Sequence, residues 1–235
     1  MRYNARLPLL LRVSLGVLMW CASQIGVAGS AQTTPLMPVP GVHMEGSRMV
    51  WQGEMAPAHA VEFARLMKQG NVDGLELRNS PGAGKFANAI FADVRNVMYK
   101  TKVRTYASGY CGSVCASIFL LGQEPTLLRS KTPGVPTFLM YHAVTYDGKV
   151  DADLTRTRIA DIAKVRGERA RHLLLKVVYE SVSQTAALYV FPKPAKTQKG
   201  SSTVVFCSGQ PGQRLGQCDP LPEGAMRDLG VVNGI

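Results

Sequence analysis

The spacing of apolar residues changes back and forth along the first half of the chain, as it does where strands alternate with helices. Short apolar or alternating runs at residues 49–51, 75–77 and 102–107 are typical of strands. Between them, apolar residues three or four positions apart predict helices over residues 56–68 and 86–98. Strands that alternate with helices pair in parallel, so the pattern predicts an α/β fold with a mainly parallel sheet and flanking helices.

The second half of the chain carries a less regular pattern. A helix is expected from Ser113 to a capping glycine at Gly122, and a strand over residues 137–143. A long apolar-periodic helix follows Asp151 and is expected to bend or break at Gly167. The remaining predictions are a poorly ordered loop at residues 192–199, an edge strand at 203–206, a closing helix at 222–229 and a short strand at 230–232.

The first 31 residues have the composition of a secretory signal peptide. They contain three arginines, no acidic residue, an apolar run at residues 13–27 and small residues at 29–31, which predicts cleavage after Ala31. Trp20 stands where a lipoprotein needs a small residue before Cys21, which disfavours lipidation. Residues 32–47 are rich in Pro, Thr and Gly without periodicity and are expected to be a disordered linker. Residues 48–235 then have the length of a single domain.

The chain is basic, with 27 Lys and Arg against 16 Asp and Glu. Loss of the three leader arginines lowers the formal charge from +11 to +8. The cationic residues are not interleaved with aromatic residues, so a solvated face is favoured over nucleic-acid binding. No later segment is expected to cross a membrane, and the localisation expected is the periplasm or the exterior.

Four cysteines remain after the leader, and export to an oxidising compartment favours disulfides. Cys207 and Cys218 bracket a loop rich in Gly and Gln that a disulfide would restrain. Cys111 and Cys115 would then pair, or remain thiols on either side of Ser113; the spacing alone allows three pairings. A redox pair usually has two intervening residues, and no further metal ligands cluster nearby, so neither redox nor metal chemistry is favoured.

Three turns carry the candidate chemistry. The strand at 75–77 leads to a Gly turn at Gly82, Ser113 stands at a second strand-to-helix turn, and His142 lies near the end of a third strand. Each alone is ordinary, since serine caps helices, Ser-Pro-Gly makes bends and histidine fills cores. Together they supply a hydroxyl nucleophile, a base and backbone N–H donors for an oxyanion, including the Val114 amide at a helix N-terminus. Because ligands bind beyond the carboxyl ends of parallel strands, we expect the Gly82 turn, Ser113 and His142 to lie together at one edge of the sheet.

The motifs Leu-Glu-Leu-Arg-Asn-Ser-Pro-Gly at 75–82 and Cys-Gly-Ser-Val-Cys-Ala at 111–116, followed by His142, resemble the Clp-type protease branch of the crotonase superfamily. The resemblance is greater to its exported bacterial periplasmic protein-like members. It implies a ClpP/crotonase-like ββα superhelix in which Ser113 is the nucleophile, His142 is the base, and Val114 with the Gly82/Ala83 turn forms the oxyanion hole. The family has a second glycine where this chain has Ala83, so the oxyanion hole is expected to be distorted if that position needs positive φ.

A carboxylate that orients the base is less clear from the sequence. Asp219 is the acid nearest the family position, with Asp151, Asp153 and Asp161 as competitors. The resemblance implies an exported serine hydrolase, a peptidase acting on a peptide or protein substrate, that needs no metal or organic cofactor. Its relatives form rings or trimers, which implies a homo-oligomer. The alternative is a non-catalytic periplasmic binding or assembly protein that retains the fold; acyl-CoA chemistry is disfavoured because that cofactor is not expected outside the cytoplasm.

Overall fold

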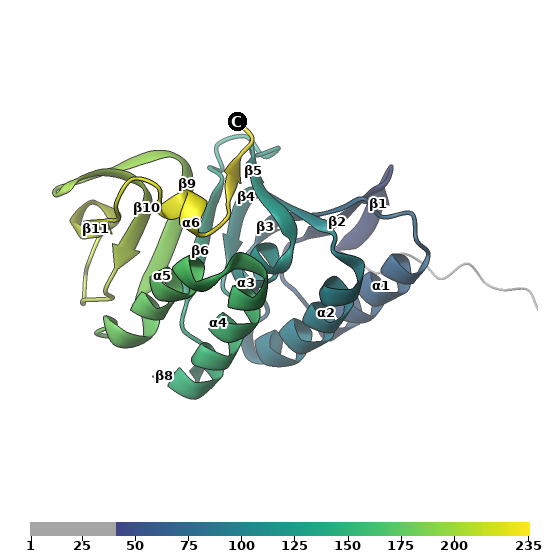
Figure 1. Ribbon diagram of the computed structural model, residues 1–235, viewed down its shortest axis with the longest axis horizontal. Coiled ribbons are helices and arrows are strands. Elements are labelled where there is room, and N and C mark those ends of the chain that lie inside the picture. Colours follow the sequence, from purple (N-terminus) through teal and green to yellow (C-terminus); the bar gives the residue numbers. More distant parts are fainter. Residues whose placement is uncertain (1–40) are drawn as a thin grey trace, which may run out of the picture. The chain divides into compact units, whose positions relative to one another are not determined.

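A ten-stranded mixed sheet runs through residues 41–235, the part of the chain that the computed structural model describes (Figure 1). Its parallel part joins β2, β3, β4 and β6, and β4 also pairs in parallel with β5, which pairs with β12. Antiparallel pairing adds β1 at one edge and β9, β10 and β11 at the other. The strands are β1 (Val42–Glu45), β2 (Arg48–Gln52), β3 (Gly74–Ser80), β4 (Arg104–Gly112), β5 (Gln123–Leu128), β6 (Phe138–His142), β9 (Ala187–Thr197), β10 (Gly200–Cys207), β11 (Asp219–Pro220) and β12 (Val232–Asn233).

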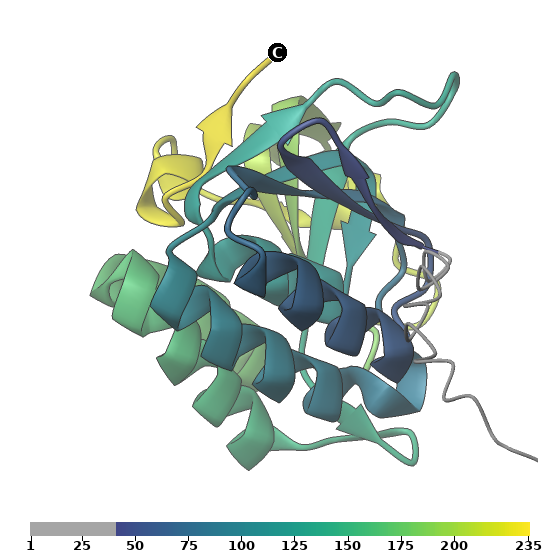
Figure 2. The same ribbon diagram turned by 90° about the vertical axis from the view of Figure 1, so that its right-hand side faces the viewer.

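Helices α1, α2 and α3 follow the parallel strands β2, β3 and β4. Figure 2 shows α1, α2 and α4 side by side along the sheet, and α3 packs against both α2 and α4. All eight residues of α3 are buried, which makes this helix the centre of the core. The helices are α1 (Pro57–Lys68), α2 (Ala87–Thr101), α3 (Val114–Leu121), α4 (Ala152–Arg166), α5 (Glu168–Tyr179) and α6 (Ala225–Asp228). A separate two-stranded hairpin, β7 (Thr145–Tyr146) and β8 (Lys149–Val150), precedes α4.

The observed order of elements confirms the predicted α/β fold with strands and helices in alternation. The expected break at Gly167 is also present, since Gly167 has φ +88° and separates α4 from α5. The face that α1 packs against the core contains Phe63 and Met67, whereas Val61 is 70% exposed.

The predicted linker ends earlier than residue 47. Residues 42–45 form β1, which pairs antiparallel with β2 through a two-residue turn at Gly46 and Ser47. Gly46 has φ +64°, the conformation that such a hairpin turn requires, and Val42 is fully buried opposite Trp51. The predicted signal peptide at 1–31 and the rest of the linker, residues 32–40, lie outside the described residues.

The loop expected at residues 192–199 is in fact part of a long hairpin. Residues 187–197 form β9 and pair with β10, so the strand expected at 203–206 lies inside the sheet rather than at its edge. Pro192 and Pro194 lie opposite the point where the register of β10 shifts, between Ser202 and Val204. Prolines are tolerated there because no regular ladder hydrogen bond is lost.

Both candidate disulfides are present. Cys111 pairs with Cys115, with Cα atoms 5.3 Å apart, and Cys207 pairs with Cys218, with Cα atoms 4.6 Å apart. Two structural disulfides are typical of a protein that folds in an oxidising compartment such as the periplasm. Within residues 41–235, no helix combines the length and the apolar character needed to cross a bilayer.

Candidate active site

The carboxyl ends of three adjacent strands bring the candidate residues together. β3 pairs in parallel with β4, and β4 with β6, so the three strands end at the same edge of the sheet. The turn that contains Gly82 follows β3, Ser113 follows β4, and His142 is the last residue of β6. The topology therefore places the three predicted turns at one edge of the sheet.

Ser113 occupies a strained position between β4 and α3. Its backbone has φ +58° and ψ −126°, a combination that residues with a side chain rarely adopt. Its amide donates to the carbonyl of Met140 on β6, at 2.8 Å. The Cys111–Cys115 disulfide closes the turn from both sides. This sharp strand-to-helix turn is the geometry that presents a nucleophilic serine at the end of a strand.

Gly82 lies directly against Ser113. A Cβ atom at Gly82 would be 2.9 Å from the Ser113 Cβ, closer than real Cβ contacts allow, and a tight 3.1 Å from the Gly112 carbonyl oxygen. The Gly82 carbonyl accepts a hydrogen bond from the Met55 amide at 2.7 Å, and its own amide donates to Ser80 Oγ at 3.3 Å. Because a trans peptide is planar, the next amide, that of Ala83, points away from Met55.

The backbone amides of Ala83 and of Val114, the first residue of α3, have no hydrogen-bond partner among residues 41–235. The Ala83 backbone has φ −133°, while Gly82 and Gly84 on either side have positive φ. The condition for the expected distortion is therefore not met at Ala83 itself, because the two glycines beside it take the positive φ values of this turn.

His142 is held by a backbone carbonyl. Its Nδ1 atom lies 2.6 Å from the carbonyl oxygen of Ala143. A carbonyl can only accept, so Nδ1 carries the proton and Nε2 keeps its lone pair. Burial lowers the pKa of His142 below its usual value, the Ala143 carbonyl opposes this shift, and the positive charge of Arg158 adds to it. The ring is therefore neutral at neutral pH, the state required of a general base.

Ser113 and His142 line the same cavity, which has a volume of about 430 Å³. No hydrogen bond joins Ser113 Oγ to the His142 ring within the described part of the chain. Catalytic hydrogen bonds are often longer in empty sites and shorten when substrate binds. The other ionisable side chains on the wall are Lys85, Tyr146, Asp147 and Arg158.

Arg158 is the buried charged group on this wall, and the sequence analysis did not identify it. It extends from α4, is 5% exposed, and donates to Asn88 Oδ1 at 2.5 Å. Its guanidinium carbon lies 5.0 Å from the centre of the Phe91 ring. One signal was available: Arg158 occupies the helical face that buries Thr155, Ile159 and Ile162, where an apolar residue is the rule.

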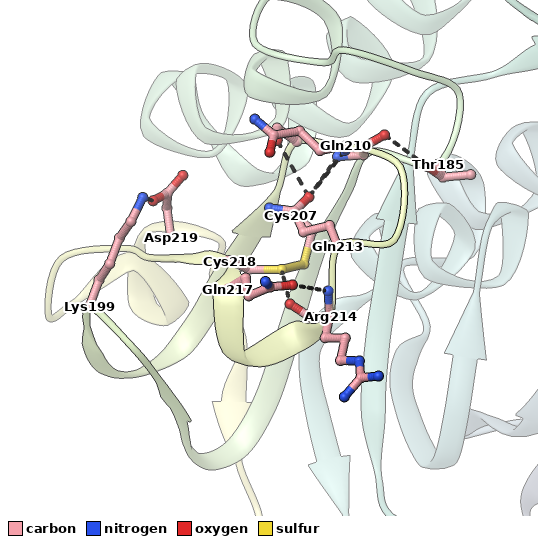
Figure 3. Close-up of a disulfide and its surroundings, with 11 residues drawn as sticks. Thr185, Lys199, Cys207, Gln210, Gln213, Arg214, Gln217, Cys218 and Asp219 are labelled. Carbon is pink, nitrogen blue, oxygen red and sulfur yellow. Dashed lines mark hydrogen bonds and ion pairs between the residues drawn. A yellow bond between two sulfur atoms is a disulfide. The ribbon is translucent and has the colours of Figure 1, made fainter.

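Asp219 lies away from the cavity. It is on β11, beside the Cys207–Cys218 disulfide, and forms an ion pair with Lys199 (Figure 3). β11 pairs with β10 and is separated from β6 by two strands. The structure therefore does not bring Asp219 together with His142.

The competing acids also have other partners. Asp151 caps α4 by accepting from the Leu154 amide at 2.9 Å. Asp153 pairs with Arg156, and Asp161 with Arg95 and Lys164. Within residues 41–235, no three His, Cys, Asp or Glu side chains are grouped so that they can hold a metal ion.

Comparison with protein-family models and with curated proteins finds no match. Among solved structures, the chain is similar to a point mutant of ClpP1 from Listeria monocytogenes. The two sequences are 17% identical, the alignment covers 56% of this chain and 78% of that one, and the TM-score is 0.41. A likeness of this size transfers neither an activity nor a substrate to this chain.

Proposed function

We propose that this chain is an exported serine hydrolase, a peptidase, with Ser113 as nucleophile and His142 as general base. The observation that carries the proposal is the shared cavity: a serine in a strained strand-to-helix turn and a neutral, Nδ1-anchored histidine face the same space. A serine hydroxyl is a weak nucleophile without such a base.

In the proposed reaction, Ser113 Oγ attacks a substrate carbonyl while His142 Nε2 accepts the hydroxyl proton. The developing oxyanion accepts hydrogen bonds from the Val114 and Ala83 amides, which have no other partner in the described residues. The amide of Gly82 contributes less, because it already donates to Ser80. His142 then gives the proton to the leaving amine, and water releases the acyl group from Ser113.

The orienting role belongs in this proposal to the Ala143 carbonyl instead of a carboxylate. An orienting group must hold the base in one tautomer and one ring position. The 2.6 Å contact to Nδ1 meets both requirements, although a neutral carbonyl stabilises the imidazolium less than a carboxylate does. The machinery is thus a serine–histidine dyad, and Asp219 stands outside it.

We also propose a ClpP/crotonase-like fold, export by a signal peptide at residues 1–31, and self-association. The strand–helix repeats β2–α1, β3–α2 and β4–α3 support the first. The two disulfides support the second, since they form in an oxidising compartment. N-terminal sequencing of the exported protein tests the signal peptide, and measurement of mass in solution tests self-association.

A fluorophosphonate probe tests the hydrolase directly, because it phosphonylates a serine only when that serine is activated. Labelling is expected for the wild type and is expected to be lost in Ser113→Ala and His142→Ala. Ser201→Ala is the matched control, since Ser201 is an exposed serine on β10 and does not line the cavity. Circular dichroism and thermal unfolding confirm that each variant is folded.

The second candidate is a non-catalytic binding or assembly protein with the same fold. The observation in its favour is that Ser113 Oγ has no hydrogen bond to the His142 ring in residues 41–235. Absence of labelling in folded, oxidised wild-type protein would favour this candidate and refute the hydrolase.

A further inference from the structure

Arg158 differs from every other buried charged side chain in residues 41–235. Three carboxylates are also buried, and each has a cationic partner: Glu62 pairs with Arg65, Glu76 with Arg78 and Lys131, and Asp161 with Arg95 and Lys164. Arg158 forms no ion pair with any described residue, and its one hydrogen bond is to the neutral amide of Asn88. A buried charge without a partner is costly, so its presence on a cavity wall requires an explanation.

The surroundings of Arg158 leave its charge uncompensated. Burial lowers the pKa of the guanidinium, yet an arginine remains charged at neutral pH. The buried Tyr141 hydroxyl has no hydrogen-bond partner in the described residues. Burial raises the pKa of Tyr141 and the positive charge of Arg158 partly opposes this rise, so the two groups lie within electrostatic range.

The cavity that contains Ser113 and His142 has a cationic wall. Lys85 and Arg158 are opposed by one acidic side chain, Asp147, which is exposed on the turn between β7 and β8, and His142 is neutral. A guanidinium offers five N–H donors in a planar fork that matches the two oxygens of a carboxylate. With one donor used by Asn88, the remaining donors are sufficient for a carboxylate on a bound molecule.

We infer that the substrate of this cavity carries a carboxylate close to the carbonyl that Ser113 attacks, and that Arg158 binds this carboxylate. The substrate assignment rests on the proposed hydrolase function, whereas the carboxylate site itself does not. Two sources share this chemistry: the free C-terminus of a peptide, and the side chain of Asp or Glu within one.

Peptide binding to the Ser113→Ala protein separates the two sources without turnover. The probes are two pairs of N-acetylated tripeptides: Ala-Ala-Ala with a free or an amidated C-terminus, and amidated Ala-Glu-Ala against Ala-Gln-Ala. Calorimetry and the NMR signals of the His142 ring report binding at millimolar peptide. We expect the acidic member of at least one pair to bind roughly 10- to 100-fold more tightly, the range for a hydrogen-bonded charge.

Variants of Arg158 identify the residue responsible. Arg158→Gln is expected to abolish the preference for the acidic peptide, and Arg158→Lys to retain only part of it, because lysine keeps the charge but not the fork. Arg156→Gln is the matched control, since Arg156 lies on the same helix, is exposed and pairs with Asp153. Thermal unfolding is measured for all three, and Arg158→Gln is expected to be no less stable than its parent, because it removes an unpaired buried charge.

Equal affinity within both pairs, no binding of either acidic peptide, or an unchanged preference in Arg158→Gln each overturns the inference. Failure of the hydrolase has a different signature. In that case the acidic peptide still binds preferentially, while the wild-type protein is not labelled by fluorophosphonate at Ser113.

Discussion

The two disulfides provide an internal comparison, because they close loops of different size and only one of them contains Ser113. The shorter loop runs from Cys111 to Cys115 and the longer from Cys207 to Cys218. The perturbation is a pair of double variants, Cys111→Ala with Cys115→Ala, and Cys207→Ala with Cys218→Ala. Alanine is chosen because three of these side chains are fully buried and the fourth nearly so.

The expected losses of stability follow from the loop sizes. In the chain-entropy treatment, loops of about 5 and about 12 residues correspond to about 2 and about 3 kcal/mol of unfolding free energy at 25 °C. The longer loop should therefore matter more for stability. Urea denaturation of the oxidised wild type and of both variants measures the difference.

Reactivity should follow the opposite order. Ser113 lies at the middle of the shorter loop with φ +58°, a conformation that costs about 1–3 kcal/mol and persists only where its surroundings impose it. Release of the 111–115 disulfide removes part of that constraint, so the rate of fluorophosphonate labelling is expected to fall by about tenfold, equivalent to about 1.4 kcal/mol. Loss of the 207–218 disulfide should leave the rate unchanged.

Two outcomes would contradict a constraint by the 111–115 disulfide: labelling of both variants at the wild-type rate, or slowing by loss of the 207–218 disulfide that equals the slowing by loss of the 111–115 disulfide. The first result would show that the Ser113 turn keeps its conformation without a local covalent constraint, and the second would show that slower labelling is not specific to release of that turn.

Three further substitutions test other parts of the structure. Gly82→Ala should abolish labelling and lower the free energy of unfolding by about 2–5 kcal/mol, because the backbone has positive φ and the new Cβ atom would clash with Ser113. Gly84→Ala is the control, since Gly84 also has positive φ but its added Cβ atom would have no contact closer than 4.0 Å. Urea denaturation should show a smaller loss of stability for Gly84→Ala. For Glu76, burial favours a higher pKa, but hydrogen bonds from cationic and hydroxyl neighbours lower it below 4.5 overall. The ionised Glu76 carboxylate therefore stabilises the protein above pH 4.5, and this stabilisation is lost as the pH falls further. Glu76→Gln should therefore make the free energy of unfolding depend less steeply on pH below pH 4.5. An unchanged pH dependence would contradict this. Asp219→Asn should leave labelling unchanged, because this residue pairs with Lys199 on β11; a large loss of labelling would restore it to the site.

The parts of the site that the sequence predicts are those fixed by local structure. A strand that ends in a Gly turn, a serine before a mainly apolar helix and a histidine at the end of a strand are each read from neighbouring residues. Parallel pairing then places the three turns at one edge, as observed for Gly82, Ser113 and His142.

The parts that were missed depend on contacts between distant segments. β1 and the β9–β10 hairpin gain their strand conformation from pairing partners, which overrides a local composition rich in Pro, Gly and Lys. Arg158 lines the cavity because α4 packs beside α2 and presents it next to Asn88. The Ala143 carbonyl could not be identified as the partner of His142, because every residue has a carbonyl and only the ring orientation selects one.

The rate of Ser113 phosphonylation as a function of pH tests the pairing of Ser113 with His142 most directly. Because the pKa of His142 is lowered by burial, the rate is expected to rise with pH through a midpoint below 6.5 and then stay constant, and His142→Ala should show neither the rise nor the plateau rate. A wild-type rate that equals that of His142→Ala across this range, or that rises only at alkaline pH, would contradict the assignment of His142 as the base.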